Sequence, residues 1–305
     1  MPKKAVLAGG SGFLGQALAR ELRSRGYEVV LLTRQPRARR GDGVREVGWG
    51  AGQPAAWAQE LEGAAVLVNF TGRSVNCVHT AENRQAILGS RLDAVCVLGA
   101  AVRGCACPPS TWAQCSATGY YGDGGGRLCD EQSAPGRGFM AEVCRQWEEA
   151  FDELALQATR KITLRIGVVL GRRGGAYPPL ARLTRWFLGG AAGDGRQGIS
   201  WIHLDDLCGI FLQAIEQDWR GTYNACAPEP ATNAEFMRAL RCALHRPWAP
   251  PVPAFAVRLA ARWLLRTDGD LILRGPRCLP RRALEGGFRF NYGTLRSALE
   301  ELAAR

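Results

Sequence analysis

The chain has 305 residues, 47% of them hydrophobic and 22% charged, which suits one large or two closely joined domains and excludes a disordered chain. Its net charge of +11 comes almost wholly from arginine, with one run at Arg34, Arg37, Arg39 and Arg40. No zinc-finger spacing, helix-turn-helix pattern or aromatic RNA-binding motif accompanies this charge, so we expect no nucleic-acid partner.

Cysteine is frequent but shows no framework. The eleven cysteines are odd in number, and the three histidines form no ligand cluster with them. Such cysteines in a chain without an export signal are typical of reduced thiols, so we expect a cytoplasmic protein with no metal site. No window of the sequence approaches a transmembrane span, and we expect no membrane partner.

Short aliphatic runs alternate with longer amphipathic segments through the first half of the chain. The expected strands span residues 5–8, 28–33, 65–70, 112–116 and 162–170. The expected helices span residues 13–25, 83–103 and 140–157. Alternation of aliphatic strands with helices predicts an α/β fold with a doubly wound parallel sheet, a Rossmann fold.

The sequence changes character after residue 170. Loops containing Gly and Pro surround expected helices at 178–188, 205–217 and 233–244, and a proline-rich stretch at 247–253 precedes a final helical region. We therefore predict two parts: a dinucleotide-binding Rossmann domain at 1–170, and a smaller, mostly helical lobe at 171–305 that closes over the carboxyl edge of the sheet and holds the substrate.

A glycine-rich loop follows the first expected strand and opens the first expected helix. Gly9 allows a tight turn, Gly12 lets the backbone approach a pyrophosphate, and Gly15 lets the helix pack on the strand. The helix N-terminus would offer its free N–H groups to the phosphates. The residues expected to bind the dinucleotide here are Gly9, Gly10, Ser11, Gly12, Phe13, Leu14 and Gly15.

The end of the second strand discriminates between two dinucleotides. An acidic residue there would bind the ribose 2′-hydroxyl of NAD, but the strand ends in Thr33 and Arg34. Arg34 can pair with a 2′-phosphate and Thr33 can donate a hydroxyl hydrogen bond, so the pattern favours NADP(H). The alternative is a solvated basic loop that binds nothing.

Several further stretches resemble the extended short-chain dehydrogenase/reductase superfamily. The glycine loop is one of its features, and the whole set is most similar to its atypical branch of nucleoside-diphosphate-sugar epimerase-like proteins, which carry a C-terminal extension. The stretches that carry the resemblance are Asn69-Phe70-Thr71-Gly72, Ser116 to Gly122, Leu164 to Gly171, Trp201 to Asp206, Thr222 to Ala225 and Gly286 to Leu302.

The resemblance implies further roles at the cofactor. Asn69, Phe70, Thr71 and Gly72 would lie against its adenosine side, and Val168 would line the nicotinamide. Arg91 could face the cofactor from the next helix, although an exposed helical arginine is an equal alternative. The superfamily also makes a homodimer plausible.

The catalytic pattern of that superfamily is not complete in this sequence. It combines a Ser or Thr after the fifth strand with a Tyr-x-x-x-Lys pair one helical turn apart, in which Lys lowers the pKa of the Tyr. Ser116 or Thr118 supplies the hydroxyl, but Met140 stands at the Tyr position and Cys144 at the Lys position. Neither side chain can perform that proton transfer.

Two tyrosines follow Ser116 closely in the sequence, at Tyr120 and Tyr121. Tyr121 is the candidate replacement acid, against the alternative that both rings pack beneath the cofactor. For His203, we expect a structural role beside Asp205 and Asp206.

Two functions remain open. The first is an NADP-dependent oxidoreductase or epimerase-like enzyme with an atypical site, acting on an unknown sugar-nucleotide or carbonyl substrate. The alternative is a non-catalytic NADP(H)-binding redox sensor or scaffold.

Overall fold

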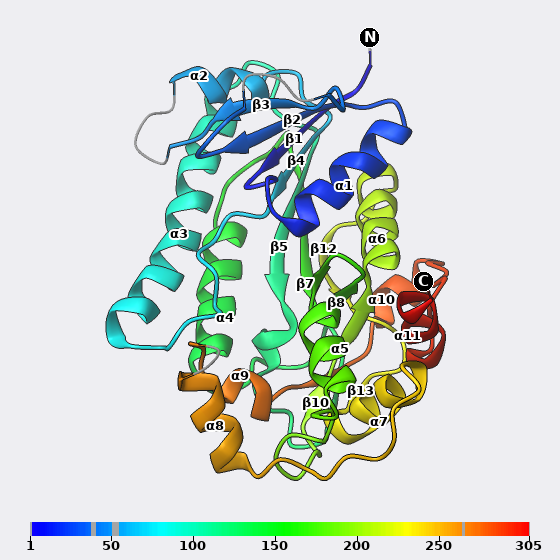
Figure 1. Ribbon diagram of the computed structural model, residues 1–305. Helices are drawn as coiled ribbons and strands as arrows, with labels where there is room; N and C mark the ends of the chain where they lie inside the picture. Colours follow the sequence, from blue (N-terminus) through cyan, green and yellow to red (C-terminus); the bar gives the residue numbers. More distant parts are fainter. Residues whose placement is uncertain (1, 38–40, 51–54, 264–265, 305) are drawn as a thin grey trace.

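The computed structural model describes residues 2–37, 41–50, 55–263 and 266–304 (Figure 1). At its centre is a seven-stranded sheet in the order β12-β7-β5-β4-β1-β2-β3, in which every neighbouring pair is parallel. The strands are β1 (Lys4–Ala8), β2 (Glu28–Thr33), β3 (Arg45–Gly48), β4 (Val66–Asn69), β5 (Thr111–Ala117), β7 (Arg160–Ile166) and β12 (Gly221–Ala225). This is the predicted α/β, doubly wound Rossmann fold.

Two helical layers cover the faces of the sheet. On one face α3 (Ala81–Arg103) packs against α4 (Phe139–Asp152), and on the other α1 (Phe13–Ser24) packs against α6 (Leu204–Glu216) (Figure 1). The strands between the layers are buried on both faces, which explains why they are runs of aliphatic residues rather than alternating patterns. Chain order reverses between β1 and β4, and the carboxyl ends of strands at such a switch point form a binding crevice.

The sheet extends beyond residue 170, the predicted division of the chain. Helix α6 covers one of its faces, and β12 pairs with β7 to form its edge. Residues of the expected C-terminal lobe therefore complete the Rossmann sheet. The sequence did not reveal this because more than fifty residues with short strands of other sheets and two helices separate β7 from β12.

The predicted strand at 162–170 is two strands in different sheets. The first, β7, ends at Ile166; after Gly167, β8 (Val168–Gly171) pairs with β11 (Trp201–His203) and β9 (Gly174–Gly175). A Cβ on Gly167 would lie 2.2 Å from the Ser200 carbonyl oxygen, so glycine permits this close crossing. The aliphatic pattern hid the break because both strands are apolar.

The remaining elements form short helices and small sheets, mostly toward the C-terminus. The helices are α2 (Ala55–Ala58), α5 (Tyr177–Arg185), α7 (Asn233–Ala243), α8 (Ala254–Trp263), α9 (Asp270–Leu273), α10 (Arg281–Glu285) and α11 (Leu295–Ala303), with 3₁₀ turns η1 (Gln59–Leu61) and η2 (Thr118–Tyr121). The short strands are β6 (Leu128–Cys129), β10 (Gly198–Ile199), β13 (Ala231–Thr232) and β14 (Arg277–Cys278). A second core around Trp201, Phe236 and Leu299 joins α5, α7 and α11.

The run from Trp201 to Asp206 anchors the C-terminal extension. His203 caps α6 by accepting the Asp205 backbone N–H on Nδ1, which leaves Nε2 to donate to Glu301 at 3.1 Å. The Asp206 carboxylate accepts the backbone N–H groups of Asn291 and Tyr292. These bonds agree with the structural role expected for His203.

Among the described residues, α3 is the one helix with the length and hydropathy of a membrane span. This helix differs from the expectation that no window of the sequence approaches a transmembrane span. In the fold α3 covers the sheet and buries Val95, Leu98 and Val102 in the core that contains the strands. A core helix of this kind meets the same criterion of length and composition.

Candidate functional site

The glycine loop joins β1 to α1 at the switch point. Gly9 has a φ of +70°, and a Cβ on Gly15 would lie 2.4 Å from the Gly10 Cα, so helix and loop touch backbone to backbone. Gly12 differs, because a Cβ there would meet nothing within 4 Å. Gly12 is also the N-cap of α1, where no side chain caps the helix. The loop thus presents an open helix N-terminus.

The loop after β4 closes one side of this opening. The buried Asn69 donates to Gln114 at 2.9 Å and accepts from the backbone N–H and hydroxyl of Thr71. A Cβ on Gly9 would lie 3.0 Å from the Thr71 nitrogen, so the two loops are in contact. Phe70 faces the other way and packs on Phe211 of α6, with ring centroids 5.4 Å apart. The hydrogen bonds of Asn69 therefore fix the shape of the loop after β4.

Thr33 and Arg34 lie where β2 ends. Thr33 is buried, whereas Arg34 is exposed and makes no hydrogen bond or ion pair with any described residue. An arginine without an internal partner beside a helix N-terminus is suited to an external anion. Of the basic run that follows, Arg37 is exposed, and Arg39 and Arg40 lie outside the described residues.

Arg91 lies beside Gly72, on the helix that follows. Its guanidinium donates to the backbone carbonyls of Arg73 and Ile87 and lies over the Trp147 ring, 5.0 Å from the centroid. A Cβ on Gly72 would lie 3.1 Å from the Arg91 Cζ. Burial lowers the pKa of Arg91. Arg91 thus supports the loop after β4 and is not the freely exposed helical arginine of the alternative interpretation.

Phe13 connects the glycine loop to β8 and β9. Its ring fills the space beside Gly171, Gly174 and Gly175, where added Cβ atoms would lie 2.4–3.2 Å from ring carbons. The first residue of β8, Val168, is 39% exposed despite its aliphatic side chain. The glycines of this hairpin admit the Phe13 ring and so fix β8 at the mouth of the crevice.

The hydroxyls of Ser116 and Tyr121 belong to a closed polar network. Ser116 Oγ donates to Glu148 Oε1 at 2.5 Å, and Glu148 forms a buried ion pair with Arg165 at 2.7 Å. Arg165 also donates to the Tyr121 hydroxyl at 2.8 Å, and that hydroxyl donates to Asn224 Oδ1 at 2.8 Å. Burial raises the pKa of Tyr121. Within this network every partner is itself a buried protein group.

Sequence reasoning missed Glu148, Arg165 and Asn224 as members of the site. A charged residue inside the aliphatic strand β7 was the available signal for Arg165, since an arginine is rarely buried there without a partner. The Arg165 guanidinium also lies over the Tyr120 ring, 3.4 Å from its centroid. Tyr120 is thus a packing ring in the sense of the alternative reading.

Met140 and Cys144 lie beside η2, which begins at Thr118. A Cβ on Gly119 would lie 3.6 Å from the Met140 Cβ and 3.8 Å from the Cys144 sulfur, so α4 presents these two side chains to the loop after β5. Burial raises the pKa of Cys144 to about 12, and Glu148 adds to that shift. The Thr118 hydroxyl makes no hydrogen bond with a described residue.

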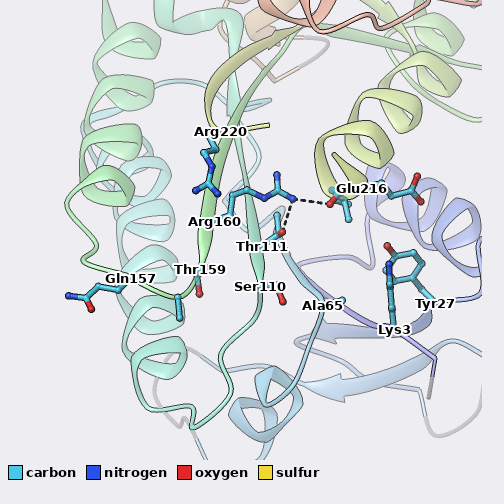
Figure 2. Close-up of a pocket in the computed structure, with 12 residues that line it drawn as sticks. Lys3, Tyr27, Ala65, Ser110, Thr111, Gln157, Thr159, Arg160, Glu216 and Arg220 are labelled. Atoms are coloured by element: carbon cyan, nitrogen blue, oxygen red, sulfur yellow. Dashed lines mark hydrogen bonds between the residues drawn. The ribbon is translucent and has the colours of Figure 1, made fainter. Parts of the chain in front are cut away.

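One hollow of the described structure lies away from the glycine loop. It has a volume of about 440 Å³ and is lined by residues at the amino ends of β1, β4, β5 and β7 (Figure 2). Arg160 in its wall donates to Thr111 and to the backbone carbonyls of Ala214, Ile215 and Trp219. These bonds attach α6 and the segment before β12 to the sheet. The residues that line the hollow therefore hold the fold together, at the sheet edge opposite the glycine loop. Within the described part of the chain, no three His, Cys, Asp or Glu residues are grouped as metal ligands would be.

Two family models match the chain. The NAD dependent epimerase/dehydratase family matches residues 5–226, and a domain of unknown function matches residues 252–302. The chain is 34% identical to the epimerase family protein SDR39U1 of Mus musculus, over 99% of this chain and 100% of the relative. It is 33% identical to the epimerase family protein YfhF of Bacillus subtilis, over 98% of this chain and 97% of the relative.

Solved structures show the same relationship. The human epimerase family protein SDR39U1, solved with NADPH, superposes with a TM-score of 0.88 at 33% identity and covers 98% of this chain and 99% of that one. The UDP-glucose 4-epimerase of Thermotoga maritima has a TM-score of 0.75 at 16% identity, over 98% of this chain and 97% of that chain, which shows a shared fold alone.

Proposed function

Because the chain belongs to the NAD dependent epimerase/dehydratase family, we propose that it binds NADP(H) along the carboxyl ends of β1, β2 and β4. The observation that carries this proposal is the open N-terminus of α1 at Gly12, together with Arg34 at the end of the neighbouring strand β2, which pairs with no described residue. The human relative solved with NADPH supports the choice of dinucleotide.

The residues around the opening fit the parts of such a ligand. The pyrophosphate would take the free N–H groups of α1, and Arg34 would pair with the 2′-phosphate. The loop from Asn69 to Gly72 would lie along the adenosine side, and Val168 would meet the nicotinamide. When bound, the cofactor supplies or accepts a hydride at that end.

For the reaction, we propose hydride exchange with a carbonyl group, such as one on a sugar nucleotide, held between the sheet edge and the C-terminal region. Of the predicted catalytic hydroxyls, Ser116 and Tyr121 are engaged by Glu148 and Arg165. In this proposal they orient the loop after β5, and Thr118 is the hydroxyl left to contact the substrate.

All eleven cysteines are free, which supports a reducing, cytoplasmic setting.

A second candidate is a protein that binds NADP(H) without turnover, as a redox sensor or scaffold. The closed network supports it, because Ser116 and Tyr121 are already engaged by Glu148 and Arg165. Met140 and Cys144 add no proton relay at the loop after β5. Single-turnover transfer of deuteride from labelled NADPH to carbonyl compounds separates the two candidates. Transfer that is reduced by Thr118→Val supports the enzyme, and tight binding without any transfer supports the sensor.

Arg34→Ala tests the proposed binding directly. We expect wild-type protein to bind NADPH more tightly than NADH, and the variant to lose about tenfold in affinity for NADPH alone, equivalent to about 1.4 kcal/mol. Cofactor fluorescence titration measures both affinities. Arg37→Ala, a nearby exposed arginine, serves as the control. Equal wild-type affinities for the two cofactors would contradict the proposal.

A further inference from the structure

Large apolar side chains are exposed on the part of the molecule built from α5, α8 and the loop before α8. Exposed fractions of 58–75% are found for Trp186, Phe187, Trp248, Phe255, Leu259 and Trp263. Large aromatic side chains are seldom left in water at this density on a monomer, and such patches mark interaction sites. We call these six residues, together with Arg258 and Arg262 of α8, the aromatic–basic surface.

Backbone contacts join the two segments that carry this surface. The Gly193 N–H donates to the Val252 carbonyl, and the Val252 N–H donates to the Ala191 carbonyl, both at 2.8 Å. The Arg246 guanidinium lies over the Phe187 ring, 5.3 Å from the centroid. The segment after α5 and the loop before α8 therefore lie side by side, at the end of the molecule farthest from β3 (Figure 1).

Helix α8 presents its apolar residues in a regular stripe. Phe255, Leu259 and Trp263 are spaced four residues apart, so they share one face of the helix. Val257 and Ala261 are buried on the other side. An apolar stripe that remains exposed after the opposite side is packed indicates a partner outside the chain.

The charge of the surroundings has one sign. Residues 154–193 and 236–267 contain no Asp or Glu, and the second stretch contains six arginines. Arg258 pairs at 3.6 Å with Asp270, at the rim of the surface, and Arg262 has no ion pair with a described residue. Aromatic residues interleaved with arginines that outnumber the nearby acids complement a partner with a negatively charged face over an apolar layer.

We propose that the aromatic–basic surface docks the protein on the face of an anionic phospholipid bilayer. Tryptophan favours the headgroup level of a membrane, while arginines attract anionic lipids, and an amphipathic helix in that plane needs no membrane span. A second copy of the chain would bring two basic surfaces together, which disfavours self-association here. The earlier expectation of no membrane partner considered transmembrane spans only, and this proposal departs from it through binding at the membrane surface.

Vesicle co-sedimentation of the full chain tests this proposal. We expect binding to phosphatidylcholine vesicles that contain phosphatidylglycerol, weakening as salt is added, and no binding to phosphatidylcholine alone. Replacing Leu259 and Trp263 by Ser, or Arg258 and Arg262 by Gln, should each lower the partition coefficient about tenfold or more. All four side chains are solvent-facing, so thermal unfolding should stay unchanged.

Leu284→Ser, at an exposed leucine on α10, is the matched apolar control, and Arg296→Gln on α11 is the matched charge control. Both should bind the vesicles as the wild type does. Absence of binding to the anionic vesicles at low salt would overturn the proposal, as would equal losses in the control variants. A dimer in sedimentation velocity that Trp263→Ser dissociates would assign the surface to a second copy instead.

Discussion

Two stretches of the same sheet edge are built in opposite ways. At β1 and β2 the structure leaves groups open: Gly12 faces space and Arg34 has no partner among the described residues. At β5 and β7 the polar groups satisfy one another, from Ser116 through Glu148 and Arg165. Open donors cost little while water can solvate them, but buried charges require fixed partners. The first stretch is therefore suited to an external anion, and the second to holding the fold.

Glu148→Gln should have the largest effect, because it leaves the Arg165 charge buried without a counter-ion. We expect the free energy of unfolding to fall by about 3–5 kcal/mol, as measured by urea denaturation. Glu149→Gln, which removes the exposed partner of Arg145, should leave the midpoint unchanged.

Replacing both Glu148 and Arg165 by Met should restore much of the lost stability, since an apolar pair of similar volume needs no counter-ion. A Glu148→Gln variant as stable as the Glu149→Gln control would show that the network is solvated. The contrast between the closed and the open stretch would then fail.

Gly12→Ala should have an intermediate effect that is confined to binding. The backbone at Gly12 has φ −80° and ψ 179°, which alanine adopts freely, and the new methyl group meets no protein atom within 4 Å. Unfolding of the cofactor-free protein should therefore be unchanged, while NADPH affinity falls about tenfold because the methyl group occupies the approach of the pyrophosphate.

Gly89→Ala is the matched control, since that glycine also faces open space but lies on α3. Fluorescence titration should show wild-type affinity for it. If Gly12→Ala binds NADPH as tightly as the wild type, the open N-terminus of α1 is not where the phosphates bind.

The open stretch could be predicted from the sequence because its parts are local. Strand, glycine loop and helix follow one another within residues 4–24, and Arg34 follows the next strand directly. The fold class followed from the same alternation of strands and helices. The short β3, with charged residues at Arg45 and Glu46, lacked the aliphatic pattern of the other strands and was not predicted.

The closed stretch could not be predicted because its contacts are distant in sequence. Tyr121 and Asn224 are 103 residues apart, and the ladder between β7 and β12 that places Asn224 opposite Arg165 is itself non-local. Ser116 was singled out and lies near the carboxyl end of β5, but its hydrogen bond to Glu148 depends on how α4 packs. Local sequence patterns predicted the exposed groups at the glycine loop and the end of β2 better than the buried partners at β5 and β7.

Selective alkylation of cysteines should give the smallest effect and the finest test of the closed stretch. Cys144 is the residue that we predicted at the position of the family's lysine, and burial raises its pKa to about 12. Cys96, Cys107 and Cys242 are exposed. Because the thiolate is the reactive form, iodoacetamide at about pH 8.5, the usual pKa of a thiol, should label these three and leave Cys144 intact. Peptide mass spectrometry reads the sites.

Labelling after urea denaturation provides the control, since Cys144 should then react as fast as Cys96. Native Cys144 that reacts at the rate of Cys96 would mean that α4 opens beside Gly119 and that this thiol is available for chemistry. If Cys144 stays unlabelled, it contributes neither charge nor a reactive thiol to the loop after β5. Any proton donor would then have to come from outside this helix, and Thr118 is the candidate hydroxyl that we propose on the loop.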